Sequence, residues 1–117
     1  MTLPNWGRLT PTQALMLSLA GHVLHGHPVE PGTVETDEDR LASMREGRDG
    51  LIAQTGRDLG FDLSRWHELL LASVDDAWGY RHPYGWRRVR SAIERALADP
   101  DRARLARMLE EELGPRR

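Results

Sequence analysis

The fold class follows from residues 61–74, which read FDLSRWHELLLASV. Asp62 is a typical N-cap residue, because its carboxylate can accept hydrogen bonds from the free N–H groups of a first helical turn. Phe61 and Trp66 flank this cap at the positions of a hydrophobic staple. The apolar face that follows is the broadest in the chain and comprises Leu63, Trp66, Leu69, Leu70, Leu71 and Val74. We therefore predict a helix here, and expect it to be the central helix of a bundle.

A capping signal also precedes the first predicted helix. Residues 10–13 read TPTQ, which combines a capping box with proline at the first helical position. The apolar residues that follow spread widely around the helix axis, so much of this helix should be buried. We expect it to run from Pro11 to His25, because Gly26-His27-Pro28 is a strong stop signal.

Thr36 is the expected N-cap of a second helix. The acidic residues 37–39 would lie in its first turn, near the positive end of the helix dipole. The helix either continues past Gly47 and Gly50 to about Leu59 or breaks near Gly47. Both readings stay open, because a glycine inside a helix costs up to about 1 kcal/mol relative to alanine.

Two more helices are expected in the C-terminal part of the chain. The first begins near Trp86 and carries an apolar face of Val89, Ile93, Ala96 and Leu97. The second opens at Asp99-Pro100, a cap followed by a first-turn proline, and stops at Gly114-Pro115. No convincing alternating strand pattern is found.

Together these signals predict an all-α fold: a single compact bundle of about five helices with irregular or orthogonal packing. The length of 117 residues suits one domain, so residues 1–117 are predicted to form a single helical domain. Residues 1–9 would be an N-terminal extension, and residues 26–36 and 79–85 the main loops. No stretch is apolar enough for a membrane helix and no signal peptide is evident.

The composition excludes some chemistry. There is no cysteine, so disulfides, thiolate metal sites and cysteine nucleophiles are excluded, and a reducing compartment such as the bacterial cytosol is expected. Lysine is also absent, and all sixteen basic side chains are arginine. A GC-rich bacterial genome accounts for this usage, and heavy use of bidentate arginine pairs is the alternative.

Residues 78–88, WGYRHPYGWRR, are the strongest candidate for a binding site. Trp, Tyr and Arg are over-represented at binding hot spots. The residues expected to contact a partner are Tyr80, Arg81, Tyr84, Arg87 and Arg90. In the alternative reading, this segment is a structured connection whose aromatic side chains fill the core. Trp66 and Trp86 are expected in the core, while Trp6 either caps the bundle or docks on a second subunit, which leaves a homodimer open.

Charge is distributed unevenly along the chain. Residues 30–49 hold seven acidic and three basic side chains, whereas residues 81–95 hold five arginines and one acid, Glu94. An acidic side and a basic side could each attract an oppositely charged partner. Alternatively, these are two solvated helix faces that partly pair with each other. The formal net charge of −2 argues against non-specific binding to nucleic acid or anionic membranes.

Residues 51–71 could form a helix-turn-helix with its corner between Gly56 and Gly60. The side chains that the second helix would present are Asp62, Ser64, Arg65, His67 and Glu68. This set lacks the positive charge that phosphate contacts need. An ordinary corner between two helices explains the glycines equally well, so nucleic acid is not the favoured partner.

His22, His25 and His27, with Glu30 just beyond, are weak candidates for a metal site. His22 and His25 are about one helical turn apart, which suits two-point ligation of a transition metal. Histidines in a last helical turn are also stabilised by the helix dipole alone.

The chain carries none of the common catalytic motifs, and no cofactor is predicted. The one acid/base hypothesis groups Asp75, Asp76 and His82 near Tyr80.

The sequence therefore predicts a small, non-catalytic protein-binding module of the bacterial cytosol, of the immunity, antitoxin, regulator or adaptor type. It would act through its polarised charged surface and the Trp/Tyr/Arg segment. A helix-turn-helix regulator that binds DNA is the alternative, and a His-dependent metal-binding protein or enzyme is the second alternative.

Overall fold

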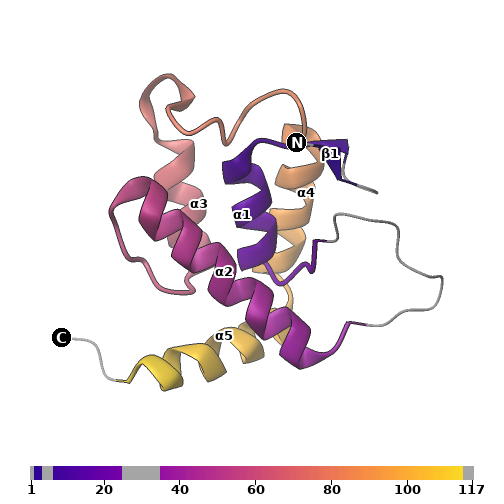
Figure 1. The fold of residues 1–117 in the computed structure, drawn as a ribbon, viewed down its shortest axis with the longest axis vertical. Coiled ribbons are helices and arrows are strands. Elements are labelled where there is room, and N and C mark those ends of the chain that lie inside the picture. Colours follow the sequence, from indigo (N-terminus) through magenta and orange to yellow (C-terminus); the bar gives the residue numbers. More distant parts are fainter. Residues whose placement is uncertain (1, 4–6, 25–34, 115–117) are drawn as a thin grey trace.

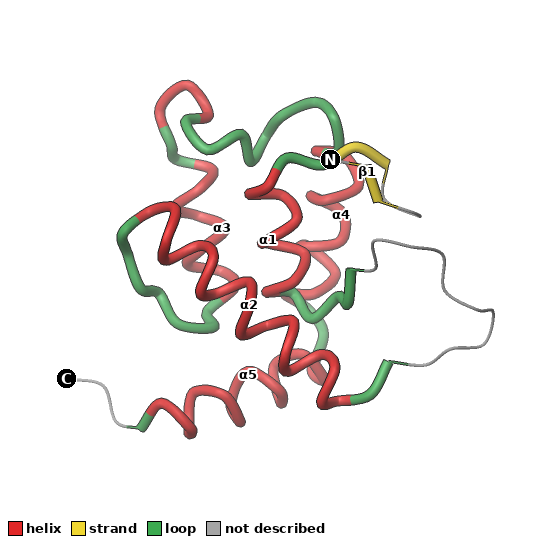
Figure 2. The backbone as a smooth tube through the Cα atoms, in the orientation of Figure 1, coloured by secondary structure: helices red, strands yellow, loops and turns green. Residues whose placement is uncertain are grey.

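A computed structural model describes residues 2–3, 7–24 and 35–114 (Figure 1). Within these residues it contains five α-helices, as predicted: α1 Pro11–Leu19, α2 Asp37–Thr55, α3 Leu63–Leu71, α4 Trp86–Leu97 and α5 Pro100–Leu113. A 3₁₀ turn, η1 (Val74–Asp76), follows α3 (Figure 2). The all-α class is confirmed, and the radius of gyration of 13.8 Å is close to the value of about 13 Å expected for a compact chain of this length. The assignment of one domain stays a prediction.

Two short strands lie in the predicted N-terminal extension. β1 (Thr2–Leu3) pairs antiparallel with β2 (Gly7–Arg8), and Thr2 lies opposite Arg8. Strands of two residues are too short to show an alternating pattern, which is why the sequence did not predict them. Trp6, for which two roles were predicted, lies outside the described residues.

Helices α1 and α4, rather than the segment 61–74, form the centre of the fold. Helix α1 packs against α2 and α4, and α4 also contacts α3 and α5 (Figure 1). Met16, Leu17 and Leu19 of α1 are fully buried. The prediction that residues 61–74 form the central helix was wrong, because α3 ends at Leu71 and Val74 is 80% exposed on η1.

Helix α1 is shorter than predicted, since it ends at Leu19 and not at His25. Gly21 has a φ of 95°, and the N–H groups of Gly21 and His22 donate to the carbonyls of Ser18 and Leu17. This pair of bonds is a Schellman motif, which closes the helix end. The stop signal predicted at 26–28 lies outside the described residues.

Helix α2 continues unbroken through Gly47 and Gly50 and ends at Thr55, because Gly56 takes a left-handed conformation with a φ of 75°. Gly47 permits a very close approach of α1. A Cβ atom at this position would lie 2.6 Å from the backbone N of Leu19 and 2.7 Å from the backbone O of Leu15. Tight helix–helix packing therefore offsets the low helix propensity of glycine, and neither predicted end of the helix was correct.

The predicted caps are confirmed. The side chains of Thr10, Thr36, Asp62 and Asp99 each accept a hydrogen bond from a backbone N–H of the helix they precede. Trp66 is fully buried as expected, and its indole N–H donates to the carbonyl of Gly60 at 2.9 Å. The core prediction was wrong for Leu97, which is 44% exposed at the end of α4.

Candidate functional site

The predicted binding segment 78–88 divides into a buried part and an exposed part. Tyr80 is fully buried, which overturns its predicted role as a partner contact. Its ring lies edge-on to those of Trp86 and His67, and its hydroxyl is 2.6 Å from His67 Nδ1. Tyr80 therefore joins α3 to the start of α4 as a core residue, in line with the alternative reading of this segment. Burial raises the pKa of its hydroxyl.

Gln13 of α1 holds the connection between α3 and α4 in place by hydrogen bonds. Its amide is fully buried, and Nε2 donates to the carbonyls of Tyr80 (3.1 Å) and His82 (2.9 Å). The Oε1 atom accepts from the Thr10 N–H at 2.9 Å, which completes the capping box. The sequence showed only the cap function of Gln13, because its contacts with residues 80 and 82 depend on tertiary structure.

Arg81 and Tyr84 are exposed, as predicted, but both contact neighbouring residues. The Arg81 guanidinium donates to the carbonyl of Ser73 at 3.1 Å, and its backbone N–H donates to Asp76 Oδ1 at 2.9 Å. The Tyr84 ring is 45% exposed and lies 4.1 Å from the guanidinium carbon of Arg8. This distance is typical of a cation–π contact. Arg81 thus holds the η1 turn in place through these hydrogen bonds. The Arg8 guanidinium covers one face of the Tyr84 ring.

Arg87 and Arg90 are exposed on the outer side of α4, whose inner side buries Val89 and Ile93. They line a shallow hollow of about 300 Å³ together with Trp86, Ser91 and Glu94. Arg90 Nε donates to Glu94 Oε1 at 2.9 Å, one helical turn away. Within the described part of the chain, the Arg87 guanidinium makes no hydrogen bond or ion pair. We refer to Tyr84, Arg87 and Arg90 as the α4 face.

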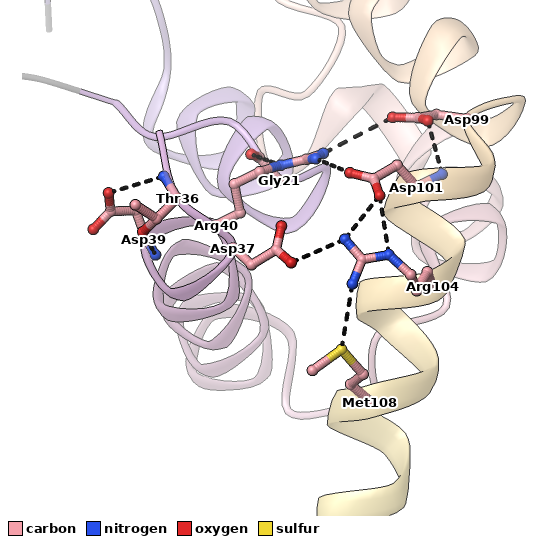
Figure 3. Close-up of polar contacts among 9 residues, drawn as sticks. All are labelled: Gly21, Thr36, Asp37, Asp39, Arg40, Asp99, Asp101, Arg104 and Met108. Carbon is pink, nitrogen blue, oxygen red and sulfur yellow. Dashed lines mark hydrogen bonds and ion pairs between the residues drawn. The ribbon is translucent and has the colours of Figure 1, made fainter. Parts of the chain in front are cut away.

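The ion pairs between α2 and α5 use one acidic residue of α2, Asp37, and two of its arginines, Arg40 and Arg45. Figure 3 shows Arg104 between Asp37 (3.0 Å) and Asp101 (2.8 Å), and Arg40 donating to Asp101 at 2.7 Å. Hydrogen bonding to Arg104 is the main cause that lowers the pKa of Asp101. Exposed pairs of this kind contribute little stability each. They join α2 to α5 at the surface of the fold.

His22 is the described member of the predicted metal group, and His25, His27 and Glu30 lie outside the described residues. It lines a cavity of about 630 Å³ with Arg40, Arg95 and Asp99 among its neighbours. Burial, and then the charge of Arg40, lower the pKa of His22. Among the described residues, no group of three or more His, Asp or Glu side chains is placed to hold a metal ion. Metal binding therefore stays a prediction.

Two other sequence hypotheses gain no support from the geometry. The connection between α2 and α3 spans residues 56–62, which is longer than the three- to four-residue turn of a helix-turn-helix. Of the proposed acid/base group, Asp76 accepts from Arg81 and His82 accepts from the Tyr84 N–H at 3.2 Å. In the described structure, no hydrogen bond or ion pair joins Asp75, Asp76 and His82 to one another.

Comparison with known proteins adds no further guidance, since no protein-family model, curated protein or solved structure matches this chain. None of the helices among the described residues has the length and apolar character to span a membrane.

Two partly buried histidines, His22 and His67, should make stability depend on pH. Burial lowers the pKa of both His22 and His67 below the usual 6.5. The unfolded chain therefore binds more protons than the folded one as pH falls through this value. The free energy of unfolding should decrease between about pH 7 and pH 5.5, by at most about 1.4 kcal/mol per pH unit for each histidine. Solvent at the half-exposed His67 makes its share smaller.

Urea unfolding of the wild type and of His22→Gln and His67→Gln across this range measures the slope. Each substitution should flatten it, because glutamine does not titrate. Slopes that are identical in all three proteins would show that neither histidine is responsible.

Proposed function

We propose that this chain is a small, non-catalytic protein-binding module of the bacterial cytosol, and that it binds an acidic surface of its partner through the α4 face. The observation that carries this proposal is the exposed guanidinium of Arg87, which has no ion pair or hydrogen bond among the described residues. It lies beside Arg90 at the edge of a hollow, on a helix whose other side is buried. Immunity proteins, antitoxins, regulators and adaptors all work as modules of this kind.

The chemistry of the α4 face suits carboxylates. A guanidinium can pair with a carboxylate through two parallel hydrogen bonds, and it is more weakly hydrated than an ammonium group. The Arg90–Glu94 pair is more than half exposed on both sides, and exposed pairs one helical turn apart contribute only about 0.3–0.5 kcal/mol. Arg90 can therefore exchange Glu94 for a partner carboxylate at little cost.

The rigidity of α4 also favours binding. Val89, Ala92 and Ile93 are buried, and Gln13 and Tyr80 fix the backbone just before the helix. The backbone then loses little conformational freedom when a partner docks, so less of the interaction energy is spent on ordering the site.

A protein fits this face better than a nucleic acid does. The formal net charge of the chain is −2, and the α4 face places Glu94 next to its arginines. Both features oppose close approach to a continuous line of phosphates. A protein surface can instead place single carboxylates opposite Arg87 and Arg90.

Reversal of two charges should abolish this binding. We expect Arg87→Glu/Arg90→Glu to weaken partner binding at least about tenfold, because both carboxylate pairs become repulsive. Arg57→Glu is the control: Arg57 is exposed beyond the end of α2 and does not line the hollow beside Arg87 and Arg90. Both variants should unfold close to the wild-type temperature, since the side chains concerned are exposed.

The measurement uses the three tagged proteins as baits in lysate of the native host, followed by titration of the captured protein. A partner retained by wild type and Arg57→Glu and lost from the double variant is the expected result. Equal capture by all three proteins, capture of nucleic acid in place of protein, or no capture by wild type would each refute the proposal.

A further inference from the structure

A groove of about 470 Å³ lies where the N-terminal end of α3, the C-terminal end of α4 and the side of α5 meet. None of the α4-face residues lines it. Its apolar wall comprises Leu59, Phe61, Leu63, Leu97, Ala103 and Ala106. The volume falls within the range of about 300–1,000 Å³ that is usual for small-molecule sites.

The three carboxylates at the groove are already used by the backbone. Asp62 Oδ1 accepts from the Arg65 N–H at 3.1 Å, which caps α3. Asp99 accepts from the first turn of α5 in the same way. Glu110 Oε1 accepts from the Phe61 N–H at 2.8 Å. These acids hold the chain in place around the groove.

The arginines of the groove, by contrast, keep unused donors. Within the described residues, the guanidinium groups of Arg65 and Arg107 make no hydrogen bond or ion pair. Arg102 is only 6% exposed, and its terminal nitrogen donates to the carbonyls of Leu19 (3.0 Å) and Phe61 (2.7 Å). Its Nε is enclosed and has no partner. The unused hydrogen-bond donors of this groove therefore belong to its arginines, and the exposed Arg65 and Arg107 can turn toward a bound anion.

We propose that the groove binds a small amphipathic carboxylate, with its aliphatic or aryl body on the apolar wall and its carboxylate between Arg65 and Arg107. The positive end of the α3 dipole adds to the attraction, since residues 62–65 line the groove. Arg102 adds a third guanidinium to the lining of the groove, with its Nε enclosed and without a hydrogen-bond partner. This site is separate from the proposed protein interface.

Octanoate and 1-octanol are suitable probes, because they share the apolar body and differ in charge. Isothermal titration with the full-length protein should show saturable 1:1 binding of octanoate, at least about tenfold tighter than 1-octanol. Shifts in two-dimensional NMR spectra should be largest at Leu63, Leu97 and Ala106. Arg65→Gln/Arg107→Gln should reduce octanoate affinity to about that of 1-octanol, and the exposed Arg57→Gln should leave it unchanged.

A second variant tests the apolar wall. Ala106→Phe places a ring in the groove and should remove binding of both probes. If this variant fails to fold, the arginine variants still decide the matter, since the side chains they replace are exposed. Absence of octanoate binding, equal affinities for the two probes, or octanoate binding that survives Arg65→Gln/Arg107→Gln would overturn the proposal.

Discussion

Gly47→Ala should lower the free energy of unfolding by about 2 kcal/mol, although alanine is the better helix former. The added methyl group would lie 2.6 Å from the backbone N of Leu19 and 2.7 Å from the backbone O of Leu15. Backbone atoms cannot rotate away as a side chain can, so α1 and α2 must separate. That separation loosens the packing around Met16 and Leu17, which are fully buried.

Two other substitutions in α2 provide the comparison. The nearest atoms to the methyl group of Gly50→Ala would belong to the side chain of Leu15, which can move, so a smaller loss is expected. Ala42→Gly at an exposed position should cost about 1 kcal/mol through propensity alone. Urea unfolding of the three variants measures these values. If Gly47→Ala is as stable as wild type or more stable, close packing does not explain this glycine.

Gln13→Glu should be more damaging still, with an expected loss of about 3 kcal/mol or more at neutral pH. The change replaces the amide nitrogen, which donates to the carbonyls of Tyr80 and His82, by a carboxylate oxygen. A buried negative charge would then face two carbonyl oxygens. The substitution should also release the connection that leads into α4, so the backbone amides of residues 79–85 should exchange hydrogen faster.

The control is Gln54→Glu, the same change of atoms at an exposed position. The Thr12 hydroxyl lies 2.7 Å from Gln54 Oε1 and 2.6 Å from the Trp78 carbonyl, and it can donate its one proton to either. Because residue 54 is exposed and a glutamate there stays hydrated, a change within about 0.5 kcal/mol is expected. Burial raises the pKa of an unpaired carboxyl group. The deficit of Gln13→Glu relative to wild type should therefore shrink as pH falls. A deficit equal to that of Gln54→Glu would contradict the role given to Gln13.

The beginnings of the helices were predictable because a cap is a local interaction. Thr10, Asp62 and Asp99 each bond to a backbone N–H two or three residues away, so the signal lies in adjacent sequence. Left-handed glycines, Gly21 and Gly56, close the ends of α1 and α2, but the sequence holds eleven glycines and does not show which of them take this conformation. The Gly21 carbonyl beyond α1 accepts from Arg40 Nε of α2, and the fit of Gly47 depends on α1. Neither contact can be inferred from the neighbouring residues.

In the candidate site too, some residues are placed by local periodicity and others by tertiary contacts. Val89 and Ile93 are four residues apart on the buried side of α4, and Arg87 and Arg90 are exposed. Helical periodicity alone predicts this exposure. Tyr80 and Tyr84 lie in an irregular connection without a period, and the sequence placed both at the surface. Only Tyr84 is there. Burial of Tyr80 depends on a hydrogen bond to His67 of α3, which composition does not reveal.

Arg102 has a consequence for how the chain folds during synthesis. Its side chain covers the carbonyl of Leu19 at the end of α1, 83 positions earlier in the sequence, and that of Phe61 before α3. A nascent chain that already contains α1, α2 and α3 still lacks the donor for both carbonyls. Since α5 follows the other described helices in the chain, these carbonyls stay with water until α5 has been synthesised, and the native contacts around them form only then.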